Sequence, residues 1–239
     1  MTDKLPPAPP SEPRARLRFY RHIDAASPWV GSRTSLRPRD AAHFPGDSLP
    51  AVFARALCER SALPAKELFE ATETFELVRK RVRRPVVAVF ERKVDRVLLI
   101  DRERPASADL LLDAAAEVAP WAPAKIEWRV ESLKRTELPE GTGVIAIHAC
   151  GLRTDASMKL AMESKGPFAA LPCCRPHRLH PAPESLKNAL GADIAIDVHR
   201  TYELENAGYH VKWQEIPRSI TPMNRVLSAV AVPAVPFRN

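Results

Sequence analysis

The sequence predicts an α/β fold with a mostly parallel sheet, and three neighbouring segments carry this prediction. Val144 to Ile147 is a short apolar run rich in β-branched residues, typical of a strand buried on both faces. Residues 154–163 show the apolar spacing of a helix, which Gly166-Pro167 then ends. Phe168 to Leu171 is a second apolar strand. A strand–helix–strand unit of this length is a βαβ crossover, so its two strands should run parallel.

Size and composition predict a cytoplasmic protein with either one large domain or one domain with an appendage. The chain has 239 residues, of which 45% are apolar, and this suffices for a core. No apolar run approaches the roughly 20 residues of a membrane span, and the N-terminus lacks the apolar core of a secretion signal. The four cysteines lack the spacing of a disulfide framework, which favours a reducing compartment. Among them, Cys58 is expected to be a small buried apolar residue.

The first third of the chain is expected to form an extension before the main domain. Residues 1–15 are rich in proline and polar residues, which predicts a disordered tail. Residues 16–84 read as a loop-rich and helical extension, with helices over 49–61 and 64–84. The α/β domain is then expected to cover residues 85–239.

Alternation of strands and helices continues through the rest of the chain. Strands are predicted over 94–100 and 125–130, with a helix over 106–118 between them. A helical region follows over 183–206. Two further strands, 210–216 and 225–232, are separated by a proline-bounded loop too short for a crossover helix, so they should pair antiparallel.

Two clusters of reactive side chains follow the central strands. His148-Ala149-Cys150 comes directly after the first strand of the βαβ unit, and Pro172-Cys173-Cys174 follows the second. Thr154 is expected to cap the helix between them, with Asp155 in its first turn. Both clusters should lie at the carboxyl ends of parallel strands, where open α/β sheets bind their ligands.

These motifs resemble those of a known family. HACGLRTDASMKLA and ALPCCRPH are similar to the H-x-C-G-x-x-T-D and C-C motifs of class I S-adenosylmethionine-dependent methyltransferase-like proteins. That family includes tRNA 2′-O-methyltransferases and glutathione-S-transferase-C-terminal-domain-containing proteins. VDRVLLIDRERP and GYHVKWQEIPRSITPMNRV resemble its bacterial branch, and the similarity spans residues 70–235. The resemblance implies a Rossmann-like methyltransferase sheet, S-adenosylmethionine as cofactor, and RNA as the leading substrate class.

The resemblance also implies roles for individual residues. Asp101, at the end of the strand over 94–100, would accept hydrogen bonds from the cofactor ribose, and Glu131 and Ser132 would lie near the adenine. The alternative for Asp101 is an ion pair with Arg102 or Arg104. His148 would act as a base, unless it is a core histidine bonded to the backbone. The implied cofactor-binding residues are Asp101, Arg102, Glu131, Ser132 and His148, and the implied catalytic residues are His148, Cys150, Asp155, Cys173, Cys174 and His177.

One segment departs from the pattern of the family. The family has a first strand, a glycine-rich turn and a helix before the strand that ends at Asp101, but residues 47–140 contain no glycine. A strand-to-strand crossover needs roughly 10–12 residues, so this region is truncated. Residues 85–89 then form the central strand, or residues 75–93 form one long helix interrupted at Pro85. The alternative function is therefore a non-catalytic methyltransferase-fold module that binds RNA or protein.

Positive charge and cysteine content raise two further hypotheses. The net charge of +7 permits a polyanionic partner. The densest basic run would contact a phosphate backbone, or it would be a solvated helix end; it comprises Arg79, Lys80, Arg81, Arg83 and Arg84. Zinc would need Cys150, Cys173 and Cys174 together with His148 or His177. Adjacent cysteines seldom chelate one tetrahedral ion, so no metal site is predicted.

Overall fold

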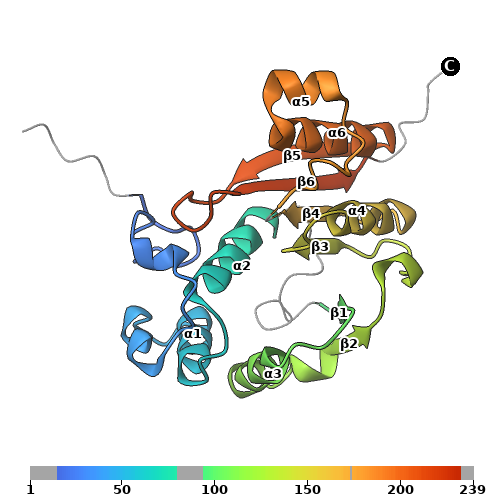
Figure 1. Ribbon diagram of the computed structural model, residues 1–239. Coiled ribbons are helices and arrows are strands. Elements are labelled where there is room, and N and C mark those ends of the chain that lie inside the picture. The colour runs from blue at the N-terminus through green and yellow to red at the C-terminus, as the bar shows by residue number, and fades with distance from the viewer. Residues whose placement is uncertain (1–14, 80–93, 173, 233–239) are drawn as a thin grey trace, which may run out of the picture.

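The computed structural model describes residues 15–79, 94–172 and 174–232 and has a mixed α/β fold (Figure 1). The predicted tail and the residues 80–93, which include the predicted central strand, lie outside the described residues. In chain order the helices and strands are α1 (Leu49–Glu59), α2 (Ala65–Val78), β1 (Val97–Asp101), α3 (Ser107–Val118), β2 (Ile126–Val130), β3 (Val144–Ile147), α4 (Arg153–Glu163), β4 (Phe168–Leu171), α5 (Glu184–Leu190), α6 (Ala192–Asn206), β5 (Tyr209–Glu215) and β6 (Arg225–Ala231). None of the helices in the described ranges is long and apolar enough to cross a membrane.

The larger sheet has the strand order β3-β4-β6-β5. β3 and β4 pair in parallel, with Val144 opposite Phe168 and Ile147 opposite Leu171, which confirms the predicted βαβ unit. β6 pairs antiparallel with both β4 and β5, so the predicted antiparallel pair at the end of the chain is also confirmed. It follows that β5 runs in the same direction as β3 and β4. β6 is the only reversed strand of this four-stranded sheet.

A second, smaller sheet contains β1 and β2. These strands pair in parallel, with Val97 opposite Ile126 and Asp101 opposite Val130, and α3 connects them. Both strands and the helix lie within three residues of their predicted bounds. The carboxyl ends of β1 and β2 therefore lie side by side. In Figure 1 this pair is drawn on the β3 side of the larger sheet, away from β5.

The larger sheet is covered on both faces, which is visible in the alternation along β4. Phe168 and Ala170 belong to a core that also contains Met158 and Ala161 of α4. Ala169 and Leu171 belong to a different core, which is built with α1, α2 and the residues before them. Because successive side chains of a strand point to opposite faces, the two cores lie on opposite sides of the sheet. Leu171 and its neighbours thus join the N-terminal extension to the sheet.

The N-terminal extension contributes many of the large side chains of the core. Leu17, Leu36 and Phe44 are almost completely buried. The ring of Tyr20 lies 5.1 Å from that of Phe44 in an edge-on arrangement, which is favourable for aromatic pairs. Cys58 is a free, fully buried cysteine on α1, as predicted. The extension therefore folds as part of the same core.

The structure corrects one predicted helix start. The helix α4 begins at Arg153, and the Thr154 hydroxyl donates a hydrogen bond to the carbonyl of Ala149 at 2.6 Å instead of capping the helix. Thr154 is fully buried, so its hydroxyl bonds to a carbonyl of the turn after β3.

The predicted helical region over 183–206 is present, but Gly191, at φ +78°, divides it into α5 and α6.

We expect Gly166→Ala to destabilise the βαβ unit. A Cβ at Gly166 would lie 1.8 Å from the carbonyl oxygen of Thr142, just before β3, so backbone would have to move. The expected loss in the free energy of unfolding is about 1–3 kcal/mol, measured by urea denaturation. Gly208→Ala is the control, since its φ of +82° is strained but its Cβ would meet no atom within 4 Å. A larger loss in the control than in Gly166→Ala would contradict this packing.

Candidate functional site

The two reactive turns lie at the same edge of the larger sheet. β3 ends at Ile147 and β4 ends at Leu171, and these two residues are register partners. The backbone N–H of His148 donates to the carbonyl of Leu171 at 3.4 Å, which joins the two turns directly. The clusters predicted after each strand therefore come from neighbouring carboxyl ends, the usual position of a ligand site in an α/β sheet.

His148 is held by a buried carboxylate that the sequence analysis did not identify. Its Nε2 lies 2.8 Å from Oε2 of Glu70, a residue of α2 that is fully buried. The Nζ of Lys66, one turn earlier in α2, donates to Oε1 of Glu70 at 2.5 Å. Burial disfavours the charged carboxylate, but the hydrogen bonds from His148 and Lys66 outweigh it and hold the pKa of Glu70 below its ordinary value. Glu70 is therefore ionised at neutral pH.

The backbone of His148 adopts a conformation that directs its side chain out of the strand. Its φ is +60°, in the left-handed region that costs a non-glycine residue about 1–2 kcal/mol. The side chain is 35% exposed, so His148 is a partly open residue whose imidazole Nε2 lies beside a buried carboxylate. The core histidine bonded to backbone, considered as the alternative, is not what the structure contains.

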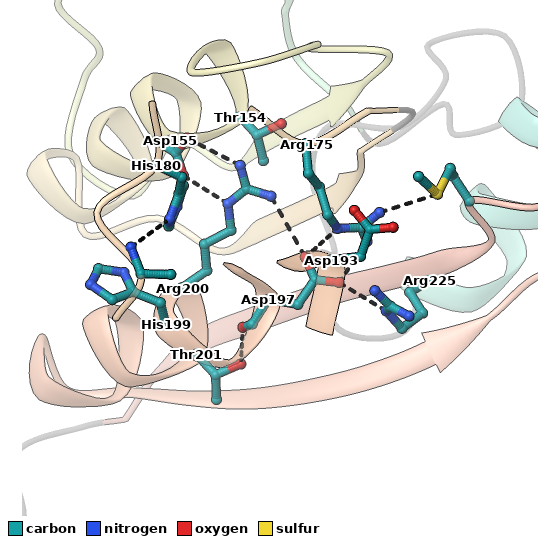
Figure 2. Close-up of polar contacts among 12 residues, drawn as sticks. Thr154, Asp155, Arg175, His180, Asp193, Asp197, His199, Arg200, Thr201 and Arg225 are labelled. Atoms are coloured by element: carbon teal, nitrogen blue, oxygen red, sulfur yellow. Dashed lines mark hydrogen bonds and ion pairs between the residues drawn. The ribbon is translucent and has the colours of Figure 1, made fainter. Parts of the chain in front are cut away.

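Asp155 of α4 forms a second polar cluster with the buried residues Arg200 and His180 (Figure 2). Arg200 of α6 donates to it twice, from Nε at 2.7 Å and from Nη2 at 3.1 Å. His180 Nε2 lies 3.3 Å from Asp155 Oδ1. The Nδ1 of His180 accepts from the backbone N–H of Ala182 at 3.1 Å, so the proton of the neutral ring is on Nε2 and donates to Asp155. Asp155 is thus bound to the scaffold, which leaves less of it available to a substrate than the resemblance implies.

Asp197 of α6 accepts hydrogen bonds from two further arginines, Arg175 and Arg225 (Figure 2). Arg175, which directly follows the Cys173-Cys174 pair, donates to both carboxylate oxygens, at 2.9 and 2.5 Å. Arg225, the first residue of β6, donates to Oδ2 at 2.8 Å. Both side chains of the Arg175–Asp197 pair are at least 95% buried. The turn after β4 is therefore fixed to α6 and β6 by a bidentate buried ion pair.

The cysteines of the two turns differ in state. Cys174 is a free, exposed cysteine, and Cys173 lies outside the described residues. Cys150 is disulfide-bonded, so the expectation that the cysteines are reduced is wrong for this residue. His177 is exposed and its Nε2 lies 2.7 Å from Oδ1 of Asp193 on α6. Within the described ranges, no three His, Cys, Asp or Glu side chains are close enough to hold a metal ion.

Of the predicted cofactor-binding residues, all but His148 lie at the carboxyl ends of β1 and β2. Asp101 is exposed, and its Oδ1 accepts from the backbone N–H of Arg102 at 2.7 Å. Arg104 instead pairs with Asp109, so the alternative of an Asp101–Arg104 ion pair is wrong. The backbone N–H of Glu131 donates to the carbonyl of Asp101 at 2.9 Å, which brings the two strand ends together.

The adjoining turn orders the other two residues predicted near the adenine. Glu131 Oε1 accepts from the hydroxyl of Thr136 at 3.1 Å, and Ser132 Oγ accepts from the backbone N–H of Lys134 at 3.4 Å.

Of the predicted basic run, Arg79 pairs with Glu76 on α2 at 2.7 Å. Lys80, Arg81, Arg83 and Arg84 lie outside the described residues.

Several residues of these clusters were not identified from the sequence. The sequence contains one weak indication for Glu70. It lies four residues after Lys66 on the same predicted helix, a spacing that allows an ion pair, and the adjacent Phe69 is apolar, which is typical of a buried helix face. Asp197 and Arg200 give a similar signal within α6. Arg175 and Arg225 are separated from Asp197 by 22 and 28 residues, and no sequence pattern pairs them.

We expect Asp197→Ala to destabilise the protein strongly. Removing this carboxylate leaves the buried Arg175 without its partner and Arg225 without its hydrogen bond, which should cost about 3–5 kcal/mol in the free energy of unfolding. Asp193→Ala is the matched control on the same helix, where the partner His177 is half exposed and the loss should stay below about 1 kcal/mol. Equal losses in the two variants, measured by chemical denaturation, would contradict a dominant role for Asp197.

His180 should make stability depend on pH. Burial is the main cause that lowers the pKa of His180 below its ordinary 6.5, and Arg200 acts in the same direction while Asp155 opposes it. The unfolded chain therefore takes up the proton first, and the free energy of unfolding should decrease as the pH falls below 6.5.

His180→Asn should show a smaller decrease, because its side chain does not titrate. The test compares urea unfolding at about pH 7.5 and about pH 5.5. His210→Asn, a substitution at an exposed histidine of β5, is the control and should keep the full decrease. An unchanged decrease in His180→Asn would refute this role for His180.

The comparisons with known proteins give no assignment. Neither a scan against protein-family models nor a search of curated proteins finds a match.

Proposed function

We propose that the protein is a class I methyltransferase-like enzyme that transfers a methyl group from S-adenosylmethionine, with RNA as the acceptor class. The observation that carries the proposal is the strand order. The orders β2-β1 and β3-β4-β6-β5, with β6 as the only reversed strand of the larger sheet, fit the layout of a parallel methyltransferase sheet that ends in an antiparallel pair. The motif residues follow the carboxyl ends of the strands in that order, where such a sheet binds ligands.

The strand ends β1 and β2 offer groups that suit the nucleoside part of the cofactor. Asp101 is exposed, and its Oδ2 has no hydrogen-bond partner in the described part of the chain, so it can accept from ribose hydroxyls. Arg102, Glu131 and Ser132 would complete this side, with Glu131 beside Asp101 through the bond between the two strand ends. When bound, S-adenosylmethionine supplies an electrophilic methyl group on sulfur, and the protein has mainly to align the acceptor with it.

His148 is the residue best placed to handle the proton of the acceptor. Its Nε2 lies 2.8 Å from Oε2 of the ionised Glu70, so Nδ1 is the ring nitrogen that remains for a hydroxyl or an amine. Glu70 acts as a positioning residue that fixes the ring, as carboxylates do for catalytic histidines elsewhere. Cys174 and His177 belong to the neighbouring turn and would line the acceptor side, with Cys150, Cys173 and Asp155 supporting it.

The second candidate function is a non-catalytic module with the same fold. Two observations favour it. Residues 47–140 contain no glycine, so the turn that lets backbone approach a cofactor is absent in its usual form. Asp155 is already bound by Arg200 and His180, which suits a structural role. Such a module would bind RNA or protein without cofactor.

Calorimetric titration with S-adenosylmethionine separates the two functions. The enzyme should bind the cofactor, and Asp101→Ala should weaken binding by roughly 10–100-fold, because a hydrogen bond to a charged group contributes about 1.5–3 kcal/mol. Asp113→Ala, which removes an exposed carboxylate of α3, is the matched control and should leave affinity unchanged.

Transfer of a labelled methyl group to RNA is the accompanying assay. We expect His148→Ala to reduce the rate by about 10²–10⁴-fold, the usual contribution of a general base. Absence of binding at millimolar cofactor would rule out the enzyme and favour the module. Equal affinities for the wild type and Asp101→Ala would instead remove Asp101 from the proposed site.

A further inference from the structure

A basic hollow lies between the N-terminal extension, the end of α2 and the edge strand β5. Its volume is about 720 Å³. Four cations and a single carboxylate are among its lining side chains, namely Arg16, Arg18, Arg21, Lys212 and Glu76. These residues come from three segments that are far apart in the sequence. None of the four cations belongs to the predicted basic run or to the predicted site residues.

The carboxylates near the hollow are already occupied. Glu76 pairs with Arg79 at 2.7 Å, so the one acid of the lining is neutralised. Glu73 is fully buried below Arg18 and accepts from its Nη1 at 3.2 Å. Arg21 and Lys212 are exposed and form no ion pair within the described part of the chain. The hollow therefore keeps an excess of positive charge that is available to an anion.

The arginines are held in place by the scaffold. The backbone N–H of Phe19 donates to the second oxygen of Glu73 at 2.9 Å, so the segment that carries Arg18 and Arg21 is fixed to α2 at two points. Arg16 donates from Nη1 to the carbonyl of His22 at 2.8 Å. Lys212 is placed by the pairing of β5 with β6, opposite Ser228. An anion that enters this hollow meets cations carried by a backbone that the scaffold holds in place, with the side chains of Arg16 and Arg18 also fixed.

We propose that this hollow binds the phosphodiester backbone of single-stranded nucleic acid. Among the residues that the structure describes, its lining contains arginine, lysine, leucine, glutamate and glutamine but no aromatic side chain on which a base could stack. Arginine and lysine at several separate positions suit a chain of phosphates, and contacts of this kind carry no base sequence. The inference extends the proposed function, since an RNA acceptor would be held here, but it does not require cofactor binding.

The test is fluorescence anisotropy of labelled oligouridine, without cofactor, over a series of salt concentrations. For single strands the slope of log K against log salt is about 0.7 per phosphate contact. Arg21→Ala combined with Lys212→Ala should therefore reduce the slope by about 1.4 and weaken binding at low salt. Arg21→Lys combined with Lys212→Arg should retain both properties, because it keeps the two charges.

A matched double variant controls for net charge. Lys134→Ala combined with Lys159→Ala removes two cations from a second hollow, along α4 and the turn after β2, and should leave the slope unchanged. Equal loss in this control, no loss in the Arg21/Lys212 variant, or no binding by the wild type at low salt would each overturn the proposal. Equal binding of oligothymidine would support recognition of phosphates regardless of the sugar. Retained oligonucleotide binding in a chain that fails to bind S-adenosylmethionine would refute the proposed enzyme and leave the hollow standing.

Discussion

The parallel pairing of β3 with β4 is the constraint on which the rest of the structure depends. Each strand has only four residues, yet their register places both motif turns at one edge of the sheet. Parallel neighbours need a crossover, and α4 supplies it while covering one face of the sheet. A slip of one residue would exchange Phe168 and Ala170 with Ala169 and Leu171 between the two cores, so the apolar pattern holds the register.

Strands this short hold the turns at their ends only weakly. Two polar clusters, one around Glu70 and one around Asp197, fix these turns from opposite faces of the sheet. Glu70 reaches from α2 to His148 at the end of β3. Asp197 reaches from α6 to Arg175 in the turn after β4. Burying charges is costly, and replacing such pairs by apolar residues is often neutral for stability, so their benefit is the fixed geometry of the turns. The N-terminal extension, which supplies Glu70, is thereby part of the candidate site.

Much of the fold follows from the sequence, whereas most of the polar contacts do not. The βαβ unit and the antiparallel pair at the end of the chain follow from apolar periodicity and from the short proline-bounded loop, both of which are local signals. The position of His148 after β3 follows in the same way. Its partner Glu70 lies 78 residues earlier, and the arginines around Asp197 come from separate elements. Only the packing of α2 and α6 on the sheet brings these groups together, and no periodicity encodes that packing.

The same limit explains why the surroundings of Thr154 and Asp155 could not be predicted. Thr154 has the residue type of a helix cap, but its burial next to the turn after β3 gives its hydroxyl a nearer acceptor. Asp155 fits the motif of a functional residue, yet a buried arginine and a histidine already bind it. In both cases the tertiary environment decides between two chemically reasonable roles for one side chain.

Hydrogen–deuterium exchange with and without S-adenosylmethionine tests the proposed site most directly, because it reports whether this cofactor binds and which segments it protects. The account predicts slower exchange in the turns after β1, β2 and β3, around Asp101, Glu131 and His148, with α5 unchanged. Exchange that is the same with and without saturating cofactor, or protection confined to helices away from the carboxyl ends of these strands, would contradict it.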